Sequence, residues 1–476
     1  MRPIAHLAAR LSTLLVLTAA VLPAQITPRG NIGQTYAQLC ANCHGPNLQG
    51  GQAPSMLDDV WTHGGDDESL ARSIRNGFPE KGMPAWGTAI PEKEIRAMVI
   101  YIHEQRAKFQ RDQTSFAKPA ESIAVKSELH DYQLDTWVRG LREPWSMAFL
   151  PGSQQALVTE KRGRLLLVEN GQLVETPIAG VPAVDSASQA GLFDVVPHPD
   201  YARNGWIYLA YSDPQRDGEK RVSLTRIIRG KLKDGALVEQ QTVYQAALEH
   251  YRNAGGVHFG GRIAFDQQGY LYFTIGERGH GPNSQNLGVP MGKVHRIHDD
   301  GRVPADNPFV KEPGALPTIW SYGHRNPQGL AFHPVSGELY DAEHGPRGGD
   351  EINLVTPRRN YGWPVITYGM NYDGSAMTDL TAKEGMEQPI VYWVPSIAVC
   401  GMNFYSGDAF PKWKNHLLLA SLAAEELRRI EIKGDKVLHQ EVLFKGLGRI
   451  RHVLPGPDGA VYVLLPDRIA RITPAK

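Results

Sequence analysis

One short pattern recurs six times from Leu141 to the end of the chain. Each copy has a small turn residue and alternating apolar residues, and a β-rich run such as Leu271–Ile275 follows it. The copies begin at residues 144, 191, 261, 329, 401 and 449. Because one such unit cannot bury its apolar face alone, six copies over about 335 residues predict a six-bladed β-propeller. A two-sheet sandwich is the alternative, and it would not explain six equivalent turns.

The composition agrees with a mainly β protein. The 476 residues include 49 Gly and 34 Pro, which indicates many turns and therefore many short strands. Lys and Arg total 50, as do Asp and Glu, so the formal net charge is zero. A nucleic-acid-binding protein needs a basic surface, so we expect no nucleic-acid partner.

The N-terminus has the pattern of a secretory signal peptide. Arg2 and Arg10 precede or flank an apolar run, Leu11–Leu22, and Ala24 offers a small residue for cleavage. The run is short for a membrane span, although an uncleaved anchor is the alternative reading. We therefore expect a signal peptide over 1–24, no membrane span in the mature chain, and a periplasmic or secreted location.

The first chemical motif is Cys40-Ala41-Asn42-Cys43-His44. C-x-x-C-H is the attachment sequence of c-type haem: two thiols join the porphyrin and the adjacent imidazole binds the iron. A zinc or redox C-x-x-C with an incidental histidine is the alternative, but a zinc site would need a second ligand pair nearby. The only other cysteine in the sequence, Cys400, lies among apolar residues and is expected to be a buried free thiol.

Methionine is a common sixth ligand of haem iron, and Met83 is the best candidate. It lies in the Gly/Pro-containing loop Lys81–Trp86, whereas Met98 follows a helical apolar pattern typical of a core position. His63 and His103 are rival ligands. Residues 31–110 thus resemble a small, all-α class I monohaem cytochrome c, and the polar, aperiodic residues 111–130 read as a linker.

Polar residues cluster at equivalent positions of the predicted blades. In a propeller these turns converge on the central channel, so they are expected to surround one pocket: Gln189, His258, Arg325, Asn326, Arg449 and Arg451. Three arginines beside a histidine suit an anionic, planar, polycarboxylate ligand. The alternative is that these groups only form hydrogen bonds within and between blades.

Residues 131–476 also resemble the soluble aldose sugar dehydrogenases that use pyrroloquinoline quinone (PQQ). The most specific segments are those around His258, at Arg325–Gly329 and at Glu343–Asn353. The resemblance implies that His258 is the general base and that Arg325 lies beside the reactive quinone carbonyl. It also implies that Gln189 and Asn326 line the site.

The same resemblance implies further ligands for PQQ and calcium. Arg449 and Arg451 would hold PQQ carboxylates. Backbone carbonyls of Gly345 and Pro346 would bind a catalytic Ca²⁺. A second, structural Ca²⁺ would use Glu351 and Tyr361.

The implied reaction oxidises the anomeric carbon of an aldose to a lactone, with PQQ as hydride acceptor. Electrons would pass to the fused haem and then to an external cytochrome or oxidase. One residue departs from the family pattern, because Ala423 stands where a PQQ-contacting lysine is common. A PQQ-dependent aldehyde (sorbosone-like) or alcohol dehydrogenase, a propeller lactonase and a non-catalytic binding propeller remain as alternatives.

Overall fold

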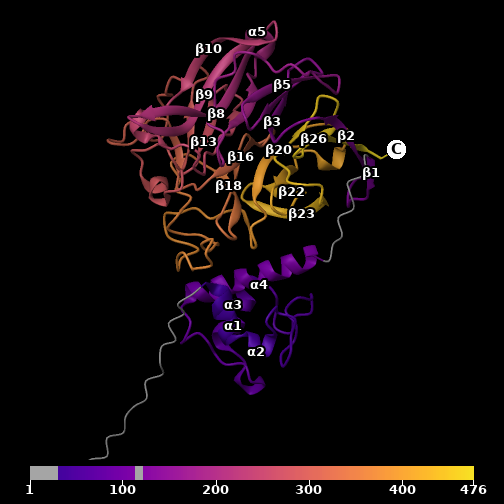
Figure 1. The fold of residues 1–476 in the computed structure, drawn as a ribbon, viewed down its shortest axis with the longest axis vertical. Helices are drawn as coiled ribbons and strands as arrows, with labels where there is room; N and C mark the ends of the chain where they lie inside the picture. Colours follow the sequence, from indigo (N-terminus) through magenta and orange to yellow (C-terminus); the bar gives the residue numbers. More distant parts are fainter. Residues whose placement is uncertain (1–30, 113–121, 476) are drawn as a thin grey trace, which may run out of the picture.

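The computed structural model describes residues 31–112 and 122–475. The predicted signal peptide, 1–24, and the middle of the predicted linker lie outside the described residues. The described chain forms a helical N-terminal domain and a larger domain of antiparallel sheets (Figure 1). Among the described residues, no helix is long and apolar enough to cross a membrane.

The larger domain is a six-bladed β-propeller, as the repeats predict. Each of the six repeat copies supplies the first strand of one sheet. Successive first strands contact one another, and the first strand of the last blade contacts that of blade 1. Blade 1 consists of β3 (Pro144–Phe149), β4 (Ala156–Glu160), β5 (Arg164–Glu169) and β6 (Gln172–Leu173). Blade 2 consists of β7 (Leu192–Pro197), β8 (Trp206–Asp217), β9 (Lys220–Lys233) and β10 (Ala236–Tyr244), with β11 (Arg252–Asn253) paired to β9.

The remaining blades repeat this antiparallel order. Blade 3 consists of β12 (Ile263–Phe265), β13 (Leu271–Ile275), β14 (Lys293–Ile297) and β15 (Ile319–Tyr322). Blade 4 consists of β16 (Pro327–Phe332), β17 (Leu339–Glu343), β18 (Asp350–Val355) and β19 (Val391–Trp393). Blade 5 consists of β20 (Val399–Phe404), β21 (Leu417–Ser421), β22 (Glu426–Lys433) and β23 (Lys436–Lys445). Short helical turns lie between strands: α5 (Tyr201–Asn204), η2 (Leu248–His250), η3 (Gly281–Gln285) and η4 (Pro411–Trp413).

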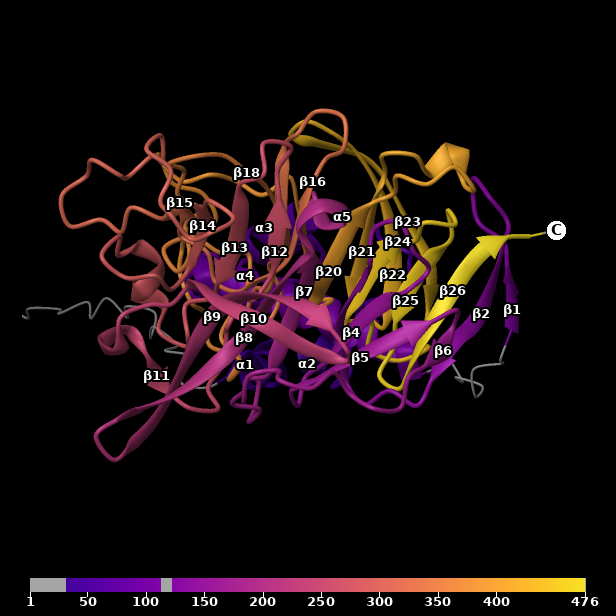
Figure 2. The same ribbon diagram turned by 90° about the horizontal axis from the view of Figure 1, so that it is seen from above.

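The last blade closes the ring with strands from both ends of the domain. Its order is β24 (His452–Pro455), β25 (Val461–Leu464), β26 (Arg468–Pro474), β2 (Tyr132–Arg139) and β1 (Ser122–Val125). Figure 2 shows β26 beside β2 and β1 at one side of the propeller. Pairing of β2 with β26 covers an edge that would otherwise stay open.

Apolar side chains pack between the blades rather than at one centre. One cluster joins blades 1 and 2 through Leu157, Leu192 and Ile207, all fully buried. Another joins blades 2 and 3 through Phe193 and Phe273. This packing leaves the first strands around the central channel to carry polar groups, as expected for a propeller.

The N-terminal domain contains α1 (Ile32–Leu39), α2 (Ala41–His44), α3 (Asp67–Asn76), η1 (Pro79–Lys81) and α4 (Glu92–Asp112). Asn31 caps α1, because its side chain accepts the Gln34 N–H at 3.2 Å. The helices share one apolar core in which Met98 is buried, as its helical pattern predicts. The expected small all-α cytochrome-like domain is confirmed.

The predicted linker, 111–130, contains regular secondary structure at both of its ends. Helix α4 continues to Asp112, and β1 begins at Ser122 and pairs with β2. The polar sequence gave no periodic signal there because β1 is half exposed at the edge of its sheet.

Candidate active site

His258 is held at the start of blade 3, on the connection between β11 and β12. Its backbone has a positive φ of 57°, and its N–H donates to Gln189 Oε1 at 2.8 Å. The ring Nδ1 forms a short hydrogen bond with the Glu277 carboxylate. Gly276 lies so close that a Cβ there would sit 2.4 Å from the His258 carbonyl oxygen. These contacts fix the ring, and they leave Nε2 as the nitrogen available to a substrate.

The surroundings of His258 keep its imidazole neutral near pH 7. Burial lowers the pKa of His258, while the hydrogen bond to Glu277 opposes this effect and the Arg325 charge adds to it. The Glu277 carboxylate accepts from Nδ1, so the proton of the neutral ring resides there. Nε2 is therefore a lone-pair acceptor, which is the form that a general base requires.

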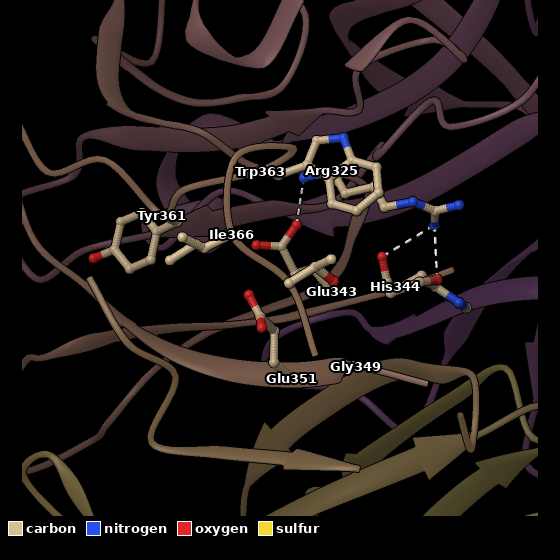
Figure 3. Close-up of a pocket in the computed structure, with 10 residues that line it drawn as sticks. Arg325, Glu343, His344, Gly349, Glu351, Tyr361, Trp363 and Ile366 are labelled. Atoms are coloured by element: carbon tan, nitrogen blue, oxygen red, sulfur yellow. Dashed lines mark hydrogen bonds between the residues drawn. The ribbon is translucent and has the colours of Figure 1, made fainter. Parts of the chain in front are cut away.

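Arg325 spans two neighbouring carbonyl groups in blade 4. Its Nη1 donates to the His344 carbonyl at 3.1 Å and to the Gly345 carbonyl at 2.8 Å, while its backbone N–H donates to Glu343 Oε2 at 2.5 Å (Figure 3). The guanidinium lies 5.0 Å from the centre of the Trp363 ring. The Gly345 carbonyl thus already faces a cation.

His344 lies at the centre of the cluster, although sequence reasoning assigned it no role. Its pKa is lowered well below the usual value, by burial first and then by Arg325, Arg451, His258 and Arg449. The positive charges of the three arginines thus act on this ring, and the His344 backbone N–H donates to the Asn326 carbonyl at 3.3 Å. Its Nε2 is buried and has no hydrogen-bond partner within residues 31–112 and 122–475. The one sequence feature that could have indicated a role for His344 is its position directly after Glu343, inside the segment Glu343–Asn353 that carries the resemblance to the family.

The other predicted residues also reach this region. Asn326 Oδ1 accepts the Gly260 N–H at 3.1 Å, next to His258 in the chain. Arg451 Nη1 donates to Gln328 Oε1 at 3.0 Å and lies 3.6 Å from the Cys400 thiol. The thiol is buried, as predicted, but its neighbours include these polar groups as well as apolar ones.

The Arg449–Arg451 segment adjoins the end of strand β21. The Ile450 N–H donates to the Ser421 carbonyl at 3.1 Å. Ala423, two residues further on, is exposed. Ile450, between the two arginines, thus pairs with a residue two positions before the one that departs from the family pattern.

A second cluster, beneath Arg325, is strongly acidic. Asp341, Glu343 and His324 place one ligand atom each within 4.8 Å of one another, and all three are buried. Burial alone would lower the pKa of His324, but the Asp341 and Glu343 carboxylates raise it to about 9. Burial and the Glu343 charge raise the pKa of Glu351 well above its usual value. One imidazolium therefore faces three carboxyl groups, an arrangement that favours a bound cation.

A cavity of about 20 Å³ lies between this acidic cluster and Arg325 (Figure 3). Its lining includes Glu343, Gly345, Glu351 and Tyr361. This volume has room for a single water molecule or ion. The Tyr361 hydroxyl donates to the Leu354 carbonyl at 2.6 Å, so the side-chain oxygen is already engaged with the backbone.

The haem motif spans the junction of α1 and α2. Cys40 and Cys43 are unpaired and partly exposed, and His44 ends α2. Burial, and then the neighbouring Cys43, raise the pKa of the Cys40 thiol to about 11. Burial lowers the pKa of His44 and favours the neutral ring that binds iron. Met83 is held by two backbone hydrogen bonds with Phe78, at 2.9 and 3.1 Å.

The larger domain matches the family model of glucose / sorbosone dehydrogenases over residues 141–473. The chain belongs to this family. Residues 30–102 match the model of the cbb3-type cytochrome c oxidase subunit III, so this dehydrogenase-family chain carries an N-terminal cytochrome c domain.

Three relatives illustrate how similar this family member is to known proteins. The aldose sugar dehydrogenase YliI of Escherichia coli (strain K12) is 42% identical over 332 residues, which are 69% of this chain and 88% of that protein. A glucose dehydrogenase crystal structure is 42% identical, with a TM-score of 0.68 over 72% of this chain and 99% of its own. The PQQ-bound form of the aldose sugar dehydrogenase from Streptomyces coelicolor is 27% identical, with a TM-score of 0.58, and the match covers 75% of this chain and 99% of that chain.

Proposed function

We propose that the chain is a periplasmic, PQQ-dependent aldose sugar dehydrogenase that passes its electrons to haem c on its own N-terminal domain. It would oxidise the anomeric carbon of an aldose to the lactone. The observation that carries this proposal is a chain of contacts at His344: its carbonyl accepts from Arg325, its N–H donates to the Asn326 carbonyl, and Asn326 Oδ1 holds the His258 loop through Gly260. Arg449 and Arg451 add positive charge that acts on the same imidazole. Family membership and the PQQ-bound relative support the same reading.

The arginine cluster fits PQQ, a planar quinone with three carboxylates. Arg325, Arg449 and Arg451 supply three positive charges that act on His344, and the Arg325 charge also acts on His258. His344 Nε2 and Arg325 Nε are buried without a hydrogen-bond partner in the described chain, so the site has polar capacity left for a ligand. When bound, PQQ would supply the two-electron acceptor that the side chains lack.

His258 would act as the general base. Its Nε2 would accept the proton of the anomeric hydroxyl, and Glu277, bonded to Nδ1, would stabilise the resulting imidazolium. The Arg325 guanidinium would place positive charge where negative charge develops on the acceptor oxygen. Gln189 and Asn326 would keep the His258 loop in place through their bonds to the backbone.

The oxygen-rich surroundings fit calcium at two places. The Gly345 carbonyl already faces the Arg325 cation at 2.8 Å, and together with Pro346 it would hold the catalytic Ca²⁺. Glu351 and the backbone carbonyl of Tyr361 would hold the structural Ca²⁺ beside the acidic cluster. The 20 Å³ cavity that these residues line supports this assignment.

The N-terminal domain fits a covalent haem. Cys40 and Cys43 would form the two thioether bonds, His44 would bind the iron from one side, and Met83 would bind it from the other. The predicted signal peptide would export the chain to the compartment where haem c proteins are assembled. An external cytochrome or oxidase would then take the electrons.

The deciding experiment is anaerobic visible spectroscopy of the haem-loaded protein with PQQ and Ca²⁺, before and after adding a panel of aldoses. We expect sugar-dependent haem reduction that needs both PQQ and Ca²⁺. No reduction by any aldose, when dithionite still reduces the haem, would contradict the proposal. A parallel PQQ titration would then distinguish another substrate from a non-catalytic propeller.

A further inference from the structure

The two domains are joined by a defined contact surface between helices α1, α3 and α4 and blade 4 with its loops. Figure 1 shows α4 lying between the rest of the cytochrome domain and the propeller. The Ile32 N–H donates to the Gly374 carbonyl at 3.1 Å, and the Tyr392 hydroxyl donates to Asp67 Oδ2 at 3.3 Å. These contacts link residues more than 300 positions apart in the sequence.

The same surface has an apolar part. Met370 of the propeller is 1% exposed and belongs to the apolar cluster of the cytochrome domain. Ala376 and Val394, also from the propeller, pack against that cluster. Beside these contacts remains a cavity of about 410 Å³ lined by both domains, which has room for several water molecules. A surface that is partly wet and modestly apolar needs polar contacts to fix its geometry.

Arg347 and Glu104 supply such a contact. The Arg347 Nε donates to Glu104 Oε1 at 3.1 Å, and Nη2 donates to Glu104 Oε2, so the pair is bidentate. The two side chains are only 27% and 21% exposed. Because the pair is both bidentate and partly buried, solvent screens it less than an ordinary surface pair.

On the propeller side, Arg347 belongs to the segment that carries the active-site carbonyls. Gly345, two residues earlier, contacts Arg325, and the Arg347 backbone pairs in both directions with Met370, at 3.1 and 2.9 Å. The ion pair therefore fastens α4 to the edge of the active site.

On the cytochrome side, the contacts continue toward the haem motif. Tyr101, one turn before Glu104 on α4, packs against Tyr36 with ring centres 5.4 Å apart. The Tyr36 hydroxyl donates to the Gly45 carbonyl at 2.6 Å, and Gly45 follows His44. Packed contacts thus run from the interface to the residue expected to bind the iron.

We propose that the Arg347–Glu104 pair is the positioning contact that docks the haem domain against the quinone site and so sets the rate of internal electron transfer. This inference rests on the proposed function. Each aldose oxidised releases two electrons and two protons. The electrons would reach the haem iron one at a time, each reducing Fe(III) to Fe(II), and the external acceptor would reoxidise the iron between them. The protons would leave through His258 to solvent.

The test is a charge-reversal cycle with Glu104→Arg, Arg347→Glu and the double variant. Small-angle scattering of the haem-loaded chains without sugar measures domain docking independently of enzyme activity. Stopped-flow spectroscopy of the loaded proteins measures haem reduction by sugar, and an artificial dye acceptor measures sugar oxidation by the propeller alone.

We expect each single variant to have a larger radius of gyration than the wild type. In the Glu104→Arg variant, sugar should reduce the haem about tenfold more slowly, because a smaller fraction of molecules has the two domains docked. Sugar oxidation with the dye acceptor should be unchanged. The double variant should recover both the compact shape and the rate. Asp59→Asn is the matched control, since it removes a carboxylate that pairs with Arg106 of the same helix inside the cytochrome domain and does not line the interdomain cavity, and it should change neither quantity.

Single variants that stay compact and transfer electrons at the wild-type rate would overturn the inference, as would a double variant that does not recover. Failure of the proposed function gives a different result, because wild-type protein would then show no dye-linked sugar oxidation. Scattering would still report whether the ion pair holds the domains together.

Discussion

The two proposed cofactor sites of this chain are constructed in opposite ways. The haem motif places two thiols and the imidazole within five consecutive residues, Cys40 to His44, at one helix junction. The propeller site gathers groups from positions as distant as Gln189 and Arg451, delivered by four different blade junctions. A local site follows from spacing alone, whereas a distributed site exists only after the whole ring has closed. Variants can therefore damage one site and spare the other.

The largest effect is expected from removing the local site. The double variant Cys40→Ala/Cys43→Ala should lose covalent haem completely, because both thioether bonds are gone, and haem staining on denaturing gels would show this. Sugar oxidation with a dye acceptor should persist, since the propeller has its own core. Loss of dye-linked activity together with haem would mean that the two sites are not independent.

The next largest effect is expected at the centre of the distributed site. His258→Asn should lower kcat for dye-linked sugar oxidation by about a thousandfold, the range of a lost general base. Haem absorbance should be unchanged. His250→Asn, a half-buried histidine eight residues earlier that pairs with Glu249, is the control and should leave kcat within about twofold. A His258→Asn enzyme of nearly wild-type rate would remove His258 from the mechanism.

A smaller effect with a distinct pH signature is expected from Glu277→Gln. Activity needs neutral His258, whose pKa is lowered by burial, so the wild-type rate should be flat above pH 6.5 and fall in more acidic buffer. The Glu277 hydrogen bond raises that pKa, so its loss should move the acid limb to lower pH. The same change should reduce kcat by about tenfold, because the ring loses its orienting partner. Rate profiles from pH 4 to 8 would measure both; an acid limb displaced upward would contradict the assigned contact.

Removing calcium should lower the thermal stability of the propeller while its fold persists. A chelator should lower the Tm of the propeller by roughly 5–10 °C, because the carboxylates of Asp341, Glu343 and Glu351 would lose a compensating cation. Glu351→Gln should remove the part of this shift that comes from the structural ion and leave any part from the ion proposed at Gly345 and Pro346, which scanning calorimetry can follow. An identical chelator shift in that variant would place the ion elsewhere.

The smallest effect is expected at the position that departs from the family pattern. Ala423→Lys adds a cation beside Arg449 and Arg451, and it should tighten PQQ binding by about tenfold, as a charge-assisted hydrogen bond would. Calorimetric titration of the metal-loaded chain would measure it. Ala423→Met, with similar length and no charge, should bind as the wild type does.

Much of the fold followed from sequence because the six repeats coincide with the six first strands. The haem motif could be predicted from five consecutive residues. Two features could not be predicted from the sequence. Sequence reasoning assigned His344 no role, and only the folded chain places its carbonyl against Arg325 and exposes its ring to the charges of three arginines. The Arg347–Glu104 contact joins residues 243 positions apart and has no periodic or motif signal at either end. The predicted roles of the individual site residues stay predictions until the variants above are measured.

The pairing of β2 with β26 also bears on how the protein is made. Strand β2 is synthesised before the first blade, and β26 ends at Pro474, two residues before the C-terminus. Strand β2 pairs with β1 on one edge, but its other edge must wait for β26. During that interval this second edge has no partner and is open to pairing with other chains. A nonsense mutation that removes even the final strand would leave the ring open and would deliver an aggregating product rather than a shortened enzyme.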